Sequence, residues 1–221
     1  MHKFSTGFYE VFEKLMNLAI WNTIWVLHTL LGLGIFGWAP ATLALFSVLR
    51  KSKLEENEFP KMKTFFKIYK SEFIRANIIG FFILFGGLSI FFSFYTLLDM
   101  DMWLQVSFGA LLFVVFILYI IVSLYIFPVA AHYQTSLKEH VRYSLMIGLA
   151  YLPQSFLLAF LVVLIGFIYQ AFPGLILFYL VSFPATLMVS IALHVFQKIE
   201  ESNRKADVME GKSHSLANLQ Q

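Results

Sequence analysis

The sequence predicts an all-α membrane protein, a bundle of about six transmembrane segments, and two observations lead to this fold class. Hydrophobic residues make up 59% of the 221 residues and charged residues only 13%, about half the share that is usual in soluble domains. Four runs, at 76–98, 103–131, 145–169 and 173–196, contain no Asp, Glu, Lys or Arg. Each is longer than the roughly 20 residues that a helix needs to cross a bilayer. Backbone groups in lipid must be hydrogen-bonded within the chain, so these runs are expected to be helices.

The first apolar run, residues 15–48, is interrupted by Gly32, Gly34, Gly37 and Pro40. One straight helix of this length would extend about 51 Å, far more than one crossing. If the run crosses once, the chain has five segments. If it folds at the glycines, two short arms raise the number to six, and Pro40 falls in the first turns of the second arm, where its missing N–H does least harm.

The positions of the basic residues predict the orientation of the segments. Of the sixteen Lys and Arg residues, eight lie in 49–75, two in 132–144 and four in 197–221, whereas the loops at 99–102 and 170–172 have none. Because basic loops stay on the cytoplasmic side, the three basic segments are expected inside. A multi-pass membrane protein with both termini in the cytoplasm is the expected topology.

Two segments beside the runs have the pattern of amphipathic interfacial helices, at 1–14 and 59–75. In the second, one face is apolar and the lysines lie elsewhere; the apolar members are Phe59, Met62, Phe65, Phe66, Tyr69 and Phe73. Such helices lie along the membrane surface and are attracted by anionic lipid. Residues 1–200 are expected to form a single transmembrane helical domain, followed by a polar, disordered cytoplasmic tail at 203–221.

A weak internal repeat favours three helical hairpins. Pro40-Ala-Thr-Leu and Pro184-Ala-Thr-Leu each precede basic residues, Arg50-Lys51 and Lys198, by ten to fourteen positions, and Pro128-Val-Ala-Ala is a fainter copy.

Polar residues inside an apolar run are candidates for structural or binding roles. Buried Asn side chains can hold helices together, and His28, deep in the first run, is either a proton or substrate contact or a neutral imidazole bonded to a neighbour. His132 and His194 lie near the basic ends of their runs, where an interfacial position is expected. The candidate positions are Asn17, Asn22, Trp25, His28, Gly37, Pro40, Thr42, Arg50, Pro128 and Pro184.

Several function classes are excluded by what the sequence lacks. The absence of cysteine removes thiolate catalysis and cysteine metal sites, and there is no metalloprotease, hydrolase or nucleotide-binding motif. The net charge of +3 is explained by the residues that set orientation and is no signal for nucleic acid. We therefore expect no enzyme, no cofactor and no metal.

The N-terminal block resembles the YesL-like family of bacterial integral membrane proteins, a family of unknown function. The resemblance covers most of residues 10–198. It is carried by Asn17-Leu18, Asn22-x-x-Trp25, Gly37-Trp38-Ala39-Pro40-Ala41-Thr42-x-Ala44 and Arg50-Lys51, and continues in Phe65-Phe66, Phe73, Asn77, Tyr125-Ile126-Phe127-Pro128 and Leu152-Pro153. It implies a companion of oligosaccharide ABC-type uptake systems, with which genes of the family often cluster in gut and soil Firmicutes.

Two functions remain open at this stage. The first is an accessory or scaffold protein that binds a sugar permease, with 59–75 and 132–144 as the inner contact face. The second is a small transporter or channel that acts on its own through broken helices. Substrate and oligomeric state do not follow from the sequence.

The topology can be tested with single cysteines, because the natural chain has none. We expect an impermeant thiol reagent on intact cells to label Asp101→Cys, and to leave Thr6→Cys and Ser213→Cys unlabelled. Labelling of Thr6→Cys from outside would remove the six-segment arrangement and leave five.

Overall fold

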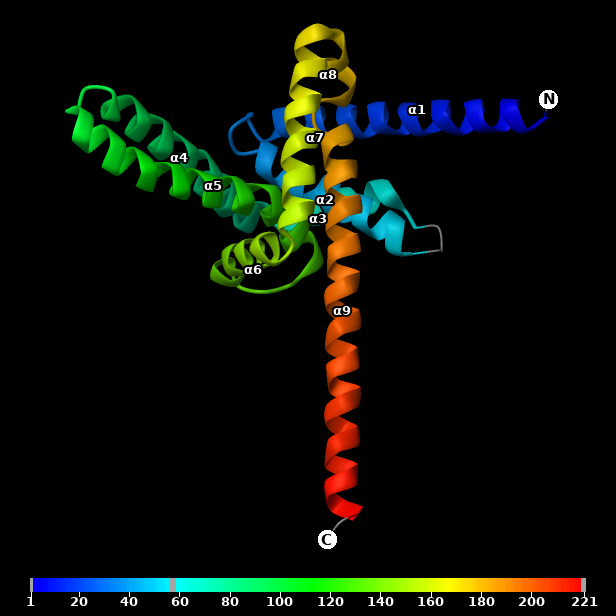
Figure 1. The fold of residues 1–221 in the computed structure, drawn as a ribbon. Coiled ribbons are helices and arrows are strands. Elements are labelled where there is room, and N and C mark those ends of the chain that lie inside the picture. The colour runs from blue at the N-terminus through cyan, green and yellow to red at the C-terminus, as the bar shows by residue number, and fades with distance from the viewer. Residues whose placement is uncertain (1, 56–58, 220–221) are drawn as a thin grey trace.

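The computed structural model describes the backbone of residues 2–55 and 59–219, and the regular structure in these ranges is helical. Figure 1 shows α1 (His2–Leu31) lying across an upright pair, α7 (Leu152–Ala171) and α9 (Ser182–Leu219). A second hairpin, α4 (Phe73–Leu97) with α5 (Met102–His132), leans away from this pair. The remaining helices are α2 (Trp38–Leu54), α3 (Lys61–Ser71), α6 (Leu137–Ala150) and α8 (Gly174–Tyr179).

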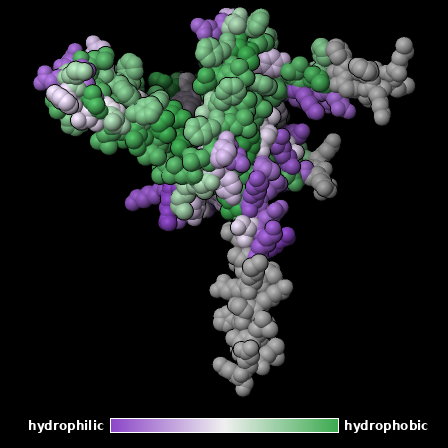
Figure 2. Space-filling model, in the orientation of Figure 1, coloured by the Kyte–Doolittle hydropathy of each residue, from purple (hydrophilic) through white to green (hydrophobic). Residues whose placement is uncertain are grey.

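The predicted class, an all-α membrane bundle, is confirmed. Within the described ranges, α4, α5, α7 and residues 182–202 of α9 have the length and hydropathy of membrane spans. Figure 2 shows hydrophobic surface over both hairpins, with hydrophilic residues at the hairpin tips and around α6 and the exposed part of α9. Helices α1 and α2, α4 and α5, and α7 and α9 contact each other as pairs, in the order expected for three hairpins, but α1 and α2 are not among the four candidate spans of the described ranges.

The first run folds at its glycines, which is the second of the two arrangements that the sequence left open, because α1 ends at Leu31 and α2 begins at Trp38. Gly34 has a φ of +75°, a conformation that is costly for residues with a side chain. Its N–H donates to the Thr29 carbonyl over 2.9 Å. Gly32 and Gly37 are needed for a different reason: a β-carbon on Gly37 would overlap the Thr29 backbone, and one on Gly32 would overlap Gly37.

Helix α2 lies at the centre of the bundle and contacts α1, α3, α4, α5 and α9. Ten of its seventeen residues are buried, so this short helix is shielded by other helices. Small residues allow the close packing: Ala39 meets Gly80 of α4, where a β-carbon would lie only 2.5 Å from that of Ala39. Pro40 is the third residue of α2, in the turn whose N–H groups have no intrahelical acceptor.

Two predicted spans are each divided into two helices, so their prediction as single helices was wrong. The run 145–169 breaks at Tyr151, between α6 and α7, and Pro153 is the second residue of α7. The run 173–196 breaks between α8 and α9, and Pro184 is the third residue of α9. In both places proline cannot continue the preceding helix, because it lacks the N–H and its ring would meet the carbonyl four residues earlier.

The amphipathic segment 59–75 forms α3 and the start of α4, but the centre of its apolar face packs on protein. Phe65 is fully buried and Tyr69 is 9% exposed, whereas Met62 and Phe66 remain more than half exposed. The first half of α1 projects from the body (Figure 1), and its described side chains from Tyr9 to Asn17 are exposed. Beyond residue 203, where the composition predicts a disordered tail, the backbone continues α9 as a helix.

The need for glycine in this turn can be tested by adding one methyl group to Gly37. We expect Gly37→Ala to destabilise the protein by about 1–3 kcal/mol, because the new β-carbon would displace the Thr29 backbone. The measurement is thermal unfolding in detergent. Gly166→Ala on α7 is the control, since nothing lies within 4 Å of that position, and its melting temperature should be unchanged or slightly raised. Equal melting temperatures for Gly37→Ala and the wild type would contradict this account of the turn.

Candidate functional site

Asn22 of α1 bridges the break between α8 and α9. Its side chain is fully buried. The amide nitrogen donates to the Leu177 carbonyl over 2.9 Å, and the amide oxygen accepts from the Val181 N–H over 3.0 Å. The side chain thus supplies one donor and one acceptor to backbone groups that a continuous helix would pair internally. It ties the middle of α1 to a segment more than 150 residues later in the chain.

Thr42 and Pro40 belong to a helix start that is repeated at Pro184. Thr42 donates to the Trp38 carbonyl over 2.7 Å, and Thr186 donates to the Ser182 carbonyl over 2.8 Å. Both prolines are the third residue of their helix, so the Pro-Ala-Thr resemblance corresponds to an equivalent local structure. Pro128, the proposed third copy, lies inside α5 and does not start a helix.

The polar residues predicted on α1 are only partly brought together. Trp25 donates its indole N–H to the Thr42 hydroxyl over 3.0 Å, which joins α1 to α2. The Nδ1 of His28 lies 2.8 Å from the Ile24 carbonyl in its own helix, and its ring packs edge-on against Phe65 at 4.8 Å. Asn17 is exposed and stands apart from these contacts.

A chain of three side chains joins the C-terminal ends of α2 and α5 to the middle of α9. Arg50 donates its Nε–H to His132 Nδ1 over 2.9 Å, and His132 Nε2 lies 3.2 Å from a Glu200 carboxylate oxygen. These contacts fit a neutral imidazole that accepts at Nδ1 and donates at Nε2. The His132 side chain is 10% exposed, so the interfacial position predicted for it is a packed contact between three helices.

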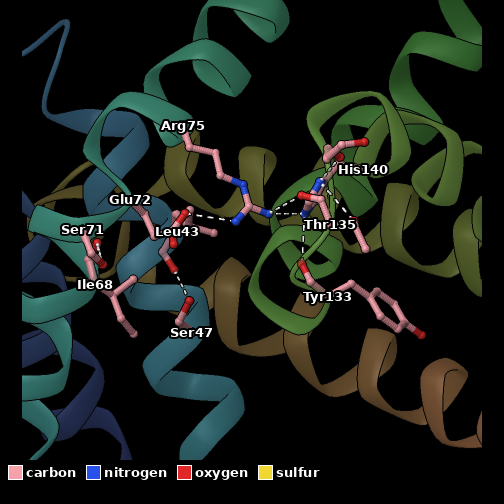
Figure 3. Close-up of polar contacts among 10 residues, drawn as sticks. Leu43, Ser47, Ile68, Ser71, Glu72, Arg75, Tyr133, Thr135 and His140 are labelled. Atoms are coloured by element: carbon pink, nitrogen blue, oxygen red, sulfur yellow. Dashed lines mark hydrogen bonds and ion pairs between the residues drawn. The ribbon is translucent and has the colours of Figure 1, made fainter.

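A second polar cluster lies where α4 begins and α6 approaches it (Figure 3). Arg75 reaches across to the loop after α5: its Nη2 lies 2.6 Å from His140 Nε2 and donates to the Thr135 carbonyl over 3.2 Å. Its Nη1 donates to Glu72 over 3.2 Å. His140 is fully buried, and its Nδ1 lies 2.6 Å from the Ser136 carbonyl. The cluster locks α6 to the start of α4.

The capping box at the start of α6 supports this cluster. Ser136 accepts from the Glu139 N–H, while a Glu139 carboxylate oxygen accepts from the Ser136 N–H over 2.9 Å. The backbone hydrogen bond from Ser136 is the largest cause that holds the pKa of Glu139 below its usual range, and the Ser136 hydroxyl adds to it.

A cavity of about 470 Å³, here named the tyrosine pocket, opens beside α6 and α9. Burial raises the pKa of the Tyr133 phenol on its wall. The Tyr133 and Tyr143 rings lie 5.8 Å apart. The lining residues are Tyr133, Thr135, Tyr143, Met146, Ile147, Ala150, Tyr151, Ile199 and Ser202. An apolar wall with a few hydroxyl groups is the usual character of a binding pocket.

Neither the Arg75 cluster nor the tyrosine pocket was predicted from the sequence. The pattern Ser136-x-x-Glu139 is a visible capping-box signal and could have indicated that a helix starts there. The pocket has no local signal, because its walls come from a loop and two helices about 50 residues apart in the chain.

These features define a multi-pass α-helical membrane protein whose helix breaks and helix ends are joined by buried polar side chains. The chain belongs to the YesL-like family. Residues 18–94 match the family described as "Protein of unknown function, DUF624".

Three relatives come from Bacillus subtilis (strain 168), and each is described as an uncharacterized protein. YteU is 32% identical over 86% of this chain and 85% of its own length. YesV is 32% identical over 88% and 93%, and YesL is 30% identical over 67% and 69%. No solved structure matches the chain.

The bridge made by Asn22 predicts a specific loss of stability. Asn22→Ala removes the side-chain partner of the Val181 N–H and the Leu177 carbonyl, which we expect to cost about 1–3 kcal/mol in the free energy of unfolding. Asn17→Ala removes the same amide from an exposed site and should change it by less than about 0.5 kcal/mol. Denaturant unfolding in detergent measures both, and equal effects would show that Asn22 is not a bridge.

Proposed function

We propose that this chain is a non-enzymatic accessory or scaffold protein that binds another integral membrane protein at its basic end. The basic end is defined as the end of the bundle that carries the last turns of α2, α3, α6 and the part of α9 after residue 197. The partner we propose is the permease of an oligosaccharide ABC-type uptake system, which rests on the family resemblance of the N-terminal block. The tyrosine pocket is the observation that carries the proposal.

The pocket has the composition of a protein-binding hot spot. Tyrosine supplies a large apolar area and a hydroxyl, and it is enriched where a partner inserts an anchoring side chain. Tyr133, Thr135 and Tyr143 belong to the segment 132–144, which was expected to form part of the inner contact face. A cavity of about 470 Å³ is large enough for an apolar anchor from a partner.

The exposed side of α3 adds positive charge at the same end. With Phe65 and Tyr69 packed inward, the opposite side of the helix presents Lys63, Lys67 and Lys70, all exposed and at helical spacing. These lysines make no ion pair among the residues that the structure describes, and such a row of cations guides encounter with an acidic surface and affects the rate of association more than the affinity. It suits a protein that must find a partner at the membrane surface.

The alternative function, a small transporter or channel, would use the helix breaks as a substrate site. At the break between α8 and α9, however, Asn22 already occupies the Leu177 carbonyl and the Val181 N–H. His132 and His140 likewise have hydrogen-bond partners on neighbouring elements. These contacts favour the accessory role. Uptake of oligosaccharide or ions into liposomes that contain this chain alone would support the transporter instead.

The proposed location is the bacterial cell membrane, with both termini in the cytoplasm. The basic end would then face the cytoplasm, as the distribution of Lys and Arg predicts. The tyrosine pocket would open toward the cytoplasmic side of a neighbouring permease.

Filling the pocket tests the proposal. We expect Met146→Trp to abolish copurification of a coexpressed oligosaccharide permease in mild detergent, because the larger side chain occupies the space of the anchor. Leu149→Trp is the matched control: it lies on the same helix, is 44% exposed compared with 52% for Met146, and does not line the pocket. It should retain the permease. If the wild type purifies without any permease, or if both variants retain it equally, the proposed site is wrong.

A further inference from the structure

A second groove lies on the opposite side of α6 from the tyrosine pocket, between α4, α5 and α6. Its volume is about 370 Å³, and Ile79 and Ile126, which are 2% and 1% exposed, form part of its lining. Ile78 and Phe82 of α4 also line it and are about half exposed, at 49% and 48%. The groove is therefore an apolar trough that is open to the surroundings of the bundle.

One charged residue lines this trough, and it is a lysine. Lys138 of α6 is exposed and makes no ion pair within the described part of the chain. Arg142 lies one turn further along α6, next to Lys138 on the helix surface. The nearest acidic residue in the chain, Glu139, has its carboxylate held by the N–H and hydroxyl of Ser136 at 2.9 and 3.0 Å. The Glu139 carboxylate still interacts with Arg142 through its charge, but Lys138 is left without a carboxylate partner in the described part of the chain.

The shape of the trough favours a lipid over a helix of another protein. Ile78 and Phe82 are one helical turn apart, so the α4 wall extends only about 6 Å along the helix. A helix of a partner protein would need a contact surface longer than this wall. An acyl chain could continue past the trough along Phe85, which is 60% exposed and follows Ile78 and Phe82 on the same helix face.

We propose that this groove, named the Lys138 groove, binds an anionic phospholipid. The phosphate of the headgroup lies at Lys138 and Arg142, and one acyl chain fills the trough and follows the apolar face of α4. A cation beside an apolar channel, at the end of membrane-spanning helices, matches both parts of such a lipid. This site lies apart from the tyrosine pocket, so it does not depend on the proposed permease partner. Bound lipid there would cover the junction that Arg75 and His140 hold together.

Native mass spectrometry of the purified full chain, titrated with phosphatidylglycerol or phosphatidylcholine, tests the proposal. We expect the wild type to retain phosphatidylglycerol in preference to phosphatidylcholine. Lys138→Ala should weaken phosphatidylglycerol binding about fivefold, the effect of one basic group at an anionic lipid surface. Lys205→Ala, which removes an exposed lysine from α9, should bind as the wild type does. Ile78→Trp, at a half-exposed position that tolerates a larger side chain, should weaken the binding of both lipids by filling the trough.

Several outcomes would overturn the proposal. Equal binding of the two lipids by the wild type would remove the role of the headgroup charge. Equal weakening by Lys138→Ala and Lys205→Ala would show that general surface charge, and not this groove, attracts the lipid. Unchanged lipid binding by Ile78→Trp would place the acyl chain elsewhere, and displacement of bound lipid by inorganic phosphate alone at the same concentration would show that the trough contributes nothing.

Discussion

The burial of α2 is the constraint on which the rest of this structure depends. A helix of seventeen residues at the centre of a bundle can be covered on all sides only if its neighbours approach closely. Ala39 and Gly80 permit one such approach, and the glycine turn before Trp38 lets α2 pack back against α1. Apolar side chains gain little from leaving lipid for protein, so packing and hydrogen bonding supply most of the stability of such a bundle. The turn contains three glycines for two reasons. Gly34 takes a positive φ, and Gly32 and Gly37 lie too close to other backbone atoms to carry a β-carbon.

Polar side chains stabilise the places where this packing leaves backbone or charge uncovered. Asn22 serves the broken helix α8–α9, His132 receives Arg50 and faces Glu200, and His140 meets Arg75. Each contact joins elements distant in sequence, and each lies at a helix break or helix end. Ionisable residues inside membranes are often parts of transport pathways, but here they are engaged with one another. They hold separate elements of the bundle together.

The two proposed binding sites, the tyrosine pocket and the Lys138 groove, lie on opposite sides of α6. The tyrosine pocket combines aromatic walls with hydroxyl groups and suits an anchoring side chain of a protein partner. The Lys138 groove is a short apolar trough with a cation and suits lipid. Helix α6 itself is held in place by its capping box and by the Arg75–His140 contact, so both sites are built on one fixed element. An accessory protein of this design would bind its protein partner on one side of α6 and a lipid on the other.

The sequence by itself determined the membrane class and the helical content, because hydropathy acts locally, and its motifs indicated the family. It offered a fold at Gly32–Gly37 as one of two arrangements of the first run. It also indicated Asn22, Trp25, Thr42 and Arg50 as positions of interest, but not what they contact. Only the tertiary structure decided that Asn22 bonds the backbone at the break before Ser182, that Asn17 stays exposed, and that α3 packs on α2 with its Phe65 ring against His28 of α1. The structure also divides two apolar runs that are continuous by hydropathy. Hydropathy does not register the backbone hydrogen bond that a proline removes. The pocket and the groove were equally invisible, because their walls come from segments that meet only when the hairpins pack.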